Sequence, residues 1–176
     1  DDPARAREVP YPCVLKPLAF SASRGVIRAD GHNSFVEAFH RIARLLRQHD
    51  PEGTRSTSRS ILVESYVPGL EVALEGLLRA GELTVLALFD KPDPLEGPYF
   101  AETIYTTPSR QPAEVQAQIG ETTAQAVAAL GLSDGPIHAE LRINDEGVWP
   151  LEIAARSIGG LCSRMLRFGT GLSLEQ

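Results

Sequence analysis

The chain has 176 residues, of which 43% are hydrophobic and 23% are charged, enough for one domain or two small lobes with a buried core. Its net charge is −6 and its basic residues form no cluster, so the composition argues against a nucleic-acid-binding protein. The two cysteines, Cys13 and Cys162, fit neither a metal motif nor a secreted disulfide framework, which favours a reducing cytoplasm.

The sequence has no apolar run of about 18 residues, the length that a membrane-spanning helix needs, and its first ten residues lack the apolar core of a signal peptide. We therefore expect neither a membrane partner nor export. The sequence starts without Met and stops soon after an expected short helix at 161–168 begins. We therefore expect a piece of a longer chain.

The first segments predict a strand followed by a polar loop. Residues 12–16 form an apolar run that ends at Lys16. Residues 19–26 are small and polar, with Gly25 able to adopt a positive φ and with backbone N–H groups that could meet an anion. The loop matches neither the GxxxxGK[ST] nor the GxGxxG phosphate-binding pattern, so on its own it is better explained as an ordinary polar connection.

A packing helix is expected next. Apolar residues recur at helical spacing from residue 34 to residue 48, and Ser34 with Glu37 fits a capping box at its start. Residues 50–60 are polar and rich in turn-forming residues, so they predict a connection without chemistry of its own.

Three strands are expected between residues 61 and 89, separated by Pro68-Gly69 and Ala80-Gly81. Their short connections predict an antiparallel meander. Glu64 and Glu71 are the carboxylates of these strands, and each, taken alone, fits an edge position that faces water. A buried carboxylate there would need a partner.

The pattern continues with a strand at 99–107, which carries Glu102, and a helix at 112–130. The helix has Pro112 in its first turn and Gly131 as its stop signal. It leads directly into the next pair of strands.

Residues 137–156 predict a β-hairpin, because apolar and polar residues alternate along both of its halves. A three-residue loop closed by Gly147 would pair Asn144 with Val148 and, counting back, Glu140 with Glu152. The apolar faces agree with this register, because they require an even register sum and a slip by one residue would expose one strand's hydrophobic set.

Two carboxylates opposite each other on one face destabilise a sheet. A divalent cation would compensate, and two carboxylates suit Mg²⁺ that is held jointly with nucleotide phosphates. The alternative is a solvated polar face. We favour the metal site because His138 and Arg156 share the face of Glu140 and Glu152.

Together these segments resemble the ATP-grasp superfamily, most closely the carboxylate-amine ligases of the amino-acid and dipeptide ligase type. The matching segments occur in order along nearly the whole chain: CVLKP, SASRGV, ILVESYVPGLEV, FDK, FAE, GLSDGPIHAEL and WPLEIAARSIGG. The resemblance implies an α+β fold, the ATP-grasp fold, with two small lobes of mainly antiparallel sheets and packing helices. The lobes would span residues 1–67, with a phosphate-covering loop at 19–26, and residues 68–176, with a metal-binding hairpin at 137–156.

The resemblance also implies a set of nucleotide-binding residues, which are Lys16, Ser21, Ser23, Gly25, Glu64, Tyr66, Val67, Glu71 and Lys91. The two lysines would contact the ATP phosphates under the loop that contains the serines and Gly25. Glu64, with the backbone of Tyr66 and Val67, would face the adenine. Glu71 would bind the ribose hydroxyls.

Glu140 and Glu152 would hold Mg²⁺, or Mn²⁺ in its place, and Arg156 would be catalytic by steadying the acyl phosphate. One departure from the family matters. The family pattern is Glu-x-Asn-x-Arg, and here Ala154 stands where the Asn would be another metal ligand. One metal ion would therefore keep an additional water or bind more weakly.

The resemblance implies a cytoplasmic, ATP-dependent, ADP-forming ligase that activates a carboxylate as an acyl phosphate and joins it to an amine. Its partners would be small-molecule carboxylates and amines and flanking domains of the same chain, with a homodimer left open. The alternatives are an ATP-grasp module that binds nucleotide without ligase activity, and carboxylation like that of biotin carboxylases. His138 could act as a base, but a structural hydrogen bond within the strand pair is the favoured interpretation.

Overall fold

The computed structural model describes residues 8–101, 104–167 and 171–174. By its contacts the chain divides into two compact units, Asp1–Val67 with Leu95–Glu102, and Pro68–Pro94 with Thr103–Gln176. The segment that starts at Leu95 therefore belongs to the first unit, although the sequence had assigned it to the second lobe. Within the described residues no helix has the length and apolar character that crossing a bilayer requires.

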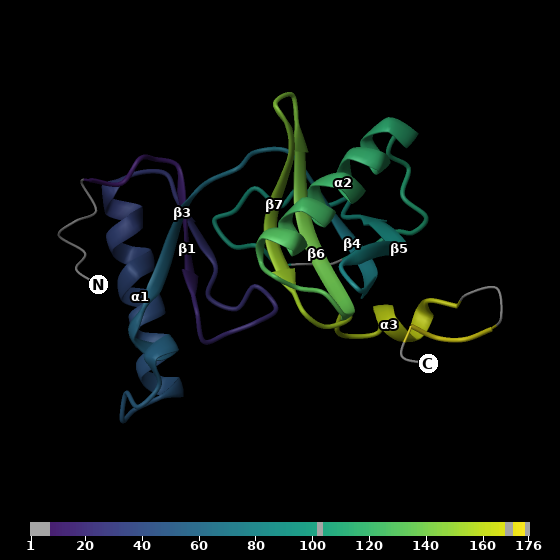
Figure 1. Cartoon of the computed structure of the whole chain (residues 1–176). Coiled ribbons are helices and arrows are strands. Elements are labelled where there is room, and N and C mark those ends of the chain that lie inside the picture. The colour runs from purple at the N-terminus through teal and green to yellow at the C-terminus, as the bar shows by residue number, and fades with distance from the viewer. Residues whose placement is uncertain (1–7, 102–103, 168–170, 175–176) are drawn as a thin grey trace. The chain divides into compact units, whose positions relative to one another are not determined.

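The first unit is an antiparallel three-stranded sheet with the order β2-β1-β3, packed against helix α1 (Figure 1). Its elements are β1 (Cys13–Pro17), β2 (Ile27–Ala29), α1 (His32–His49), the 3₁₀ helix η2 (Ser56–Arg59) and β3 (Ile61–Ser65). The sequence predicted β1, α1 and β3 but not the short strand β2. This strand forms because its two inward residues, Ile27 and Ala29, are buried against α1.

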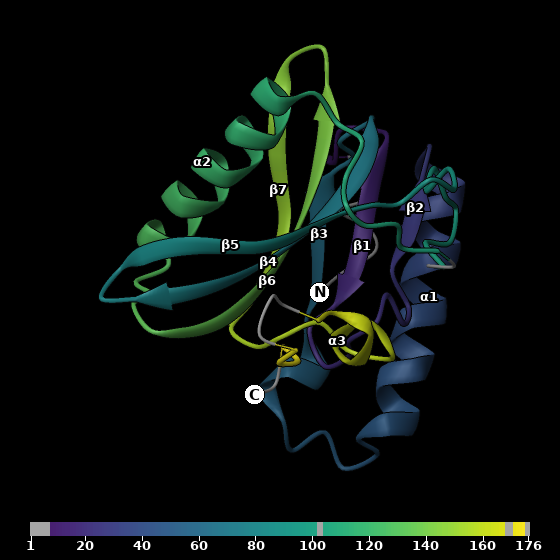
Figure 2. The same ribbon diagram turned by 90° about the vertical axis from the view of Figure 1, so that its right-hand side faces the viewer.

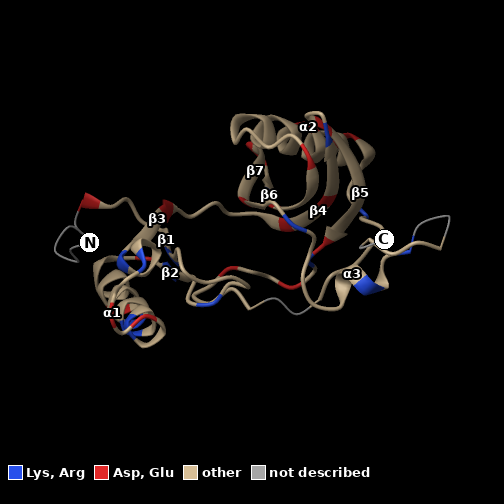
Figure 3. Cartoon of the chain, turned by 60° about the horizontal axis from the view of Figure 1, so that its bottom comes forward, with Lys and Arg blue, Asp and Glu red and all other residues tan. Residues whose placement is uncertain are grey.

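Helix α1 buries one face, made of Phe35, Ala38, Ile42 and Leu46, and its solvent side carries charges of both signs (Figure 3). It begins earlier than predicted, because Gly31 is the N-cap. The hydroxyl of Ser34 accepts hydrogen bonds from the N–H groups of Asp30 and Gly31, each at 3.1 Å. Ser34 therefore satisfies the helix start from its first turn, and the predicted capping box with Glu37 is wrong.

Residues 95–101 complete the edge of the first unit beside β2. The N–H of Arg28 donates to the carbonyl of Pro98 (2.9 Å), and Ile27 forms an isolated bridge with Tyr99. The predicted strand at 99–107 is wrong, because among its described residues only two isolated bridges form, one at Tyr99 and one between Asp90 and Thr106. Its carboxylate Glu102 lies outside the described residues.

The second unit is an antiparallel four-stranded sheet with the order β5-β4-β6-β7, and helix α2 lies along one of its faces (Figure 2). Its elements are β4 (Leu70–Arg79), β5 (Glu82–Asp90), α2 (Ala113–Ala129), β6 (Gly135–Asn144), β7 (Gly147–Ala154) and the short helix α3 (Cys162–Met165). The buried face of α2 consists of Ile119, Thr123 and Val127, spaced by one turn each. The predicted helix at 112–130 is thus confirmed.

Strand β4 is the centre of this sheet, and its residues from Glu71 to Gly76 are all buried. It pairs with β5 on one side and with β6, far along the sequence, on the other. The predicted three-strand meander is therefore wrong, since β3 pairs with β1 in the first unit. Glu71 is also not at an exposed edge, as had been expected for it taken alone.

The hairpin of β6 and β7 pairs Glu140 directly with Glu152, as predicted. The predicted loop is wrong, because Asn144 pairs with Gly147 across a two-residue turn and not with Val148. On β7, Pro150 pairs with Leu141 of β6 and Glu152 pairs with Glu140 of β6. A bulge between Pro150 and Glu152 therefore shifts the register back by one residue. The shift returns the apolar residues of both strands to a common face.

Gly69 directly precedes β4 and lies against Ile143 of strand β6. It has a φ of +125°, and an added Cβ would lie 2.2 Å from the carbonyl oxygen of Ile143. Gly81 has a φ of +82°, and no atom lies within 4 Å of the position that an added Cβ would take. Substituting Gly81 therefore measures the cost of the left-handed backbone without a steric contact.

We expect Gly69→Ala to destabilise the protein more than Gly81→Ala does, by at least about 1–3 kcal/mol, the usual cost of overpacking. Gly81→Ala itself should cost about 1–2 kcal/mol for its left-handed backbone. Urea unfolding of both variants measures the difference. Equal destabilisation would mean that the close contact at Gly69 relaxes freely.

Candidate functional site

One face of the second sheet is lined by charged side chains from neighbouring strands. Glu71 and Glu75 of β4 pair with Arg142 and His138 of β6, and Glu140 lies between these two on β6. Because side chains alternate between the faces of a sheet, this register places all five on the face opposite α2. Strand β7 extends the same face with Glu152 and Ala154, which pair with Glu140 and His138.

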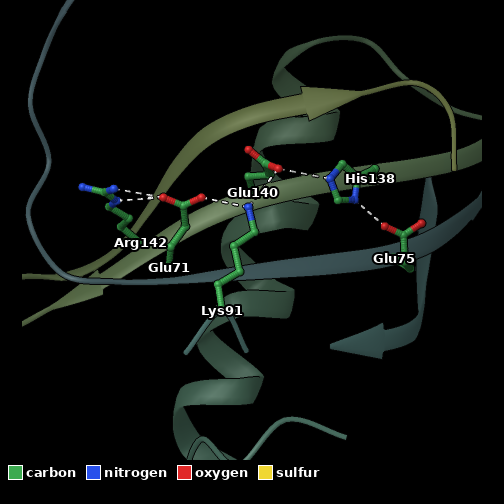
Figure 4. Close-up of polar contacts among 6 residues, drawn as sticks. All are labelled: Glu71, Glu75, Lys91, His138, Glu140 and Arg142. Carbon is green, nitrogen blue, oxygen red and sulfur yellow. Dashed lines mark hydrogen bonds and ion pairs between the residues drawn. The ribbon is translucent and has the colours of Figure 1, made fainter. Parts of the chain in front are cut away.

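Five of these side chains, together with Lys91, which directly follows β5, form a continuous series of alternating charges, which we call the charge chain (Figure 4). In order it consists of Arg142, Glu71, Lys91, Glu140, His138 and Glu75. The guanidinium of Arg142 donates to Glu71 Oε2 at 3.0 and 3.1 Å. Lys91 Nζ donates to Glu71 Oε1 at 2.8 Å and to Glu140 Oε1 at 3.0 Å.

The charge chain is largely buried. The side chains of Glu75, Lys91 and Arg142 are 1%, 2% and 3% exposed. Charged groups at such depth persist only when they are paired, because their hydration is lost. Each internal member accordingly contacts two neighbours of opposite charge, so the six side chains of the charge chain stabilise one another.

Glu75 closes one end of the charge chain and anchors the segment that follows β7. Its Oε1 contacts Nδ1 of His138, while its Oε2 accepts a hydrogen bond from the N–H of Ile158 at 2.9 Å. Ile158 is buried in a small cluster with Ala73 and Phe89. Arg156, two residues earlier, therefore lies on a short bridge between the end of β7 and this anchor.

His138 lies between two carboxylates, with Nε2 3.4 Å from Glu140 Oε1. Burial alone would lower its pKa, but the hydrogen bonds and negative charges of Glu140 and Glu75 outweigh burial and raise the pKa to about 9. The imidazole thus serves as a cation of the charge chain at neutral pH. Its shorter contact is to Glu75 on β4, so the structural bond that the sequence favoured joins β6 to β4 and not to β7.

Glu140 and Glu152 are opposed and chemically fit a divalent cation. The Glu140 side chain is 18% exposed, and Glu152 is exposed and makes no ion pair with any described residue. The described residues contain no group of three His, Cys, Asp or Glu side chains that could enclose a metal ion. Two carboxylates with one open side suit Mg²⁺ whose remaining ligands are water and phosphate oxygens.

The remaining predicted nucleotide-binding residues lie in the first unit. Lys16 and Glu64, on adjacent strands, form an ion pair with Nζ 2.5 Å from Oε2. In the 19–26 loop Gly25 has the expected positive φ of +80°, as do Ala22 and Ser23 with +55° and +53°.

Several backbone donors of this region are already used. The N–H groups of Arg24 and Val26 close turns onto the carbonyls of Ser21 and Ser23. The N–H of Tyr66 donates to the carbonyl of Pro12 at 3.1 Å. These three N–H groups are therefore not free to meet an anion, whereas the sequence had suggested that several N–H groups of the 19–26 loop would be available.

The structure thus joins Glu71, Lys91 and Glu140 by direct ion pairs and sets Glu152 opposite Glu140. Sequence reasoning assigned no role to Glu75 or Arg142. The signal for Glu75 was its spacing from Glu71, since residues four apart in a strand share a face. For Arg142 the signal was its alternation with His138 and Glu140.

Comparison with known proteins gives a consistent result. The family model described as ATP-grasp domain matches residues 9–165. The chain is 32% identical over 164 residues to carnosine synthase 1 of Gallus gallus. The aligned region covers 90% of this chain and 17% of that protein. It is 28% identical over 156 residues to dapdiamide A synthase of Enterobacter agglomerans. This second aligned region covers 85% of this chain and 34% of that protein.

Among solved structures, an L-amino acid ligase from Bacillus licheniformis superposes with a TM-score of 0.69 and 30% identity. The match covers 86% of this chain and 33% of that structure. The chain thus spans between 17% and 34% of the length of these relatives.

The position of His138 predicts a pH dependence of stability in the metal-free protein. Because its folded pKa of about 9 is above the unfolded value of 6.5, its protonation stabilises the fold fully below pH 6.5, and this contribution is lost as the pH rises through about 9. We expect the free energy of unfolding to fall across this window, and His138→Gln to remove that part of the fall. Urea titrations with a chelator, from pH 6 to pH 10, measure it. Parallel pH profiles of the two proteins would contradict the assignment.

Proposed function

The chain belongs to the ATP-grasp domain family, and from this membership we propose that it is the nucleotide-binding part of an ADP-forming ligase that joins a carboxylate to an amine. The observation that carries the proposal is the pairing of Glu140 with Glu152 on the charged face, with Lys91 Nζ 3.0 Å from Glu140. This arrangement brings metal-ligating carboxylates and a phosphate-binding ammonium to one place. Phosphoryl transfer depends on such positioning and charge neutralisation.

In this proposal the residues of the second unit handle the reacting groups. Glu140 and Glu152 hold Mg²⁺, which when bound neutralises charge on the transferring phosphoryl group. Lys91 contacts a phosphate as a point charge. Glu71 turns toward the ribose hydroxyls, and the forked guanidinium of Arg156 meets charge that develops on the activated carboxylate.

The residues of the first unit handle the rest of the nucleotide. Lys16 contacts phosphates, and Glu64 with the backbone of Tyr66 and Val67 faces the adenine. The loop that contains Ser21, Ser23 and Gly25 covers the phosphates. The three consecutive or near-consecutive positive φ angles of that loop support this role, because such turns make concave surfaces for anions.

We propose amino acids as the substrate class. The support is the 30% identity to a structure named as an L-amino acid ligase, together with relatives named as synthases. Other domains of the same chain would complete the substrate pocket, since the relatives are much longer than this chain. The need for ATP and the two free cysteines fit a cytoplasmic enzyme.

A module that binds nucleotide without joining substrates is the competing function. Ala154 favours it, since Ala cannot coordinate a metal where the family has Asn. Ala154 pairs with His138, whose imidazole is already held by two carboxylates, so no neighbour replaces the missing ligand among the described residues.

Product analysis of the complete protein separates these functions. We expect ADP and phosphate to appear in equal amounts with an amide product when ATP, Mg²⁺ and a panel of amino acids are supplied. Bicarbonate should not replace the amine. ATP binding without turnover on any pair would favour the binding module, and bicarbonate-dependent turnover would favour carboxylation.

Two substitutions separate the roles of Glu152 and Arg156. Glu152 holds metal in both ground and transition states, so Glu152→Gln should weaken Mg·ATP binding as well as turnover. Arg156→Lys keeps the charge but loses the fork, so kcat should fall by roughly 10²-fold while ATP affinity stays within a few-fold. Steady-state kinetics and ATP titration measure both. A raised KM for ATP with normal kcat would make Arg156 a nucleotide-binding residue.

A further inference from the structure

Lys91 is the most completely enclosed cation of the charged face. Its side chain is 2% exposed, and Nζ lies 2.8 Å from Glu71 and 3.0 Å from Glu140 (Figure 4). Nζ also lies 5.0 Å from the centre of the Tyr105 ring. The N–H of Lys91 also donates to the carbonyl of Glu71 at 3.2 Å, which fixes the start of its side chain. The ammonium is therefore held in place by the fold itself.

The groups that hold Lys91 are those that the proposed function assigns to other ligands. Glu71 is assigned to the ribose, Glu140 to the metal and Lys91 to a phosphate, yet without ligands the three bond to one another. Each part of a metal–nucleotide complex must then replace an internal ion pair. Replacing only one would leave a buried charge without its partner, which is costly.

We propose that Lys91 is an internal counter-cation, which competes with a divalent metal for Glu140 and so makes metal binding depend on a nucleotide phosphate. The inference rests on the proposed function, since it takes the metal ligands and the nucleotide from there. A divalent cation between Glu140 and Glu152 would stand beside an ammonium that already bonds Glu140 Oε1. The two cations repel each other until an anion joins them.

A phosphate is the anion that relieves this conflict. It can accept hydrogen bonds from the ammonium and coordinate the metal with another oxygen, so both cations gain an anionic partner. Thermodynamic linkage then requires the effect to be reciprocal, with metal raising phosphate affinity by the same factor. Lys91 would in this way select the metal–nucleotide complex over either free metal or free nucleotide.

The test is Mn²⁺ binding to the complete protein in the absence of nucleotide, measured by electron paramagnetic resonance of the free ion. Lys91→Met removes the charge and keeps an unbranched apolar stem. We expect it to bind Mn²⁺ more tightly than the wild type by about 5- to 150-fold, the usual range of coupling between sites. Arg79→Met removes an exposed charge at the end of β4, outside the charge chain, and should leave Mn²⁺ affinity within about twofold.

Two further variants secure the result. Adding Glu140→Gln to Lys91→Met should abolish the gain in Mn²⁺ affinity. The reason is that the gain comes from the Glu140 carboxylate, which Lys91→Met releases from its ion pair. Lys91→Gln, whose amide can still donate to Glu71, replaces the Met variant if circular dichroism finds that one unfolded. A folded Lys91 variant with unchanged or weaker Mn²⁺ affinity would overturn the inference.

A parallel ADP titration keeps this inference distinct from the proposed function. Normal Mn·ADP binding by the wild type, with no gain in Mn²⁺ affinity in the Lys91 variants, would overturn only the role of Lys91. Failure of the wild type to bind ADP with Mn²⁺ would overturn the proposed function itself.

Discussion

The second unit depends on burying carboxylates of its inner strand β4 against cations from neighbouring segments. Glu71 and Glu75 of β4 are buried, and the cations opposite them on β6, Lys91 and the N–H of Ile158 make that burial tolerable. The same pairing fixes the register of β4 against β6. A slip by one residue would turn both carboxylates toward the apolar face that packs on α2. Site geometry and fold specificity thus rest on the same ion pairs.

Local patterns in the sequence were enough to predict the hairpin and its opposed carboxylates. The pairing of Glu140 with Glu152 was counted back from a three-residue loop and agreed with the alternation of apolar residues, and the structure has this pairing although the loop was assigned wrongly. The structure reaches the same register by a shorter turn and a bulge next to Pro150, on an edge strand where a missing N–H is tolerated. Burial of the apolar face, which the sequence does reveal, therefore constrains the register more than the turn does.

Long-range pairing was beyond local patterns. Nothing in the run from Ile61 to Phe89 says that β3 joins β1 or that β4 joins β6. In the structure β4 and β6 are linked by complementary charges, such as Glu75 with His138, which lie 63 residues apart. The anchor from Glu75 to the N–H of Ile158 spans 83 residues and involves a backbone group, which carries no sequence signal. Sequence periodicity could therefore find the metal-binding carboxylates but not the contacts that hold their neighbours.

The first unit is discontinuous along the sequence, because residues 95–101 return to it after β4 and β5. Pro98 accepts from the N–H of Arg28, the Arg28 guanidinium donates to the carbonyl of Glu96 at 2.8 Å, and a side chain at Gly97 would collide with Arg28. A coding segment that ended at residue 67 would leave the edge of β2 without these partners. Recombination with one crossover would therefore disrupt the first unit. The two units are expected to be inherited as a single cassette, and homologous genes should exchange them together.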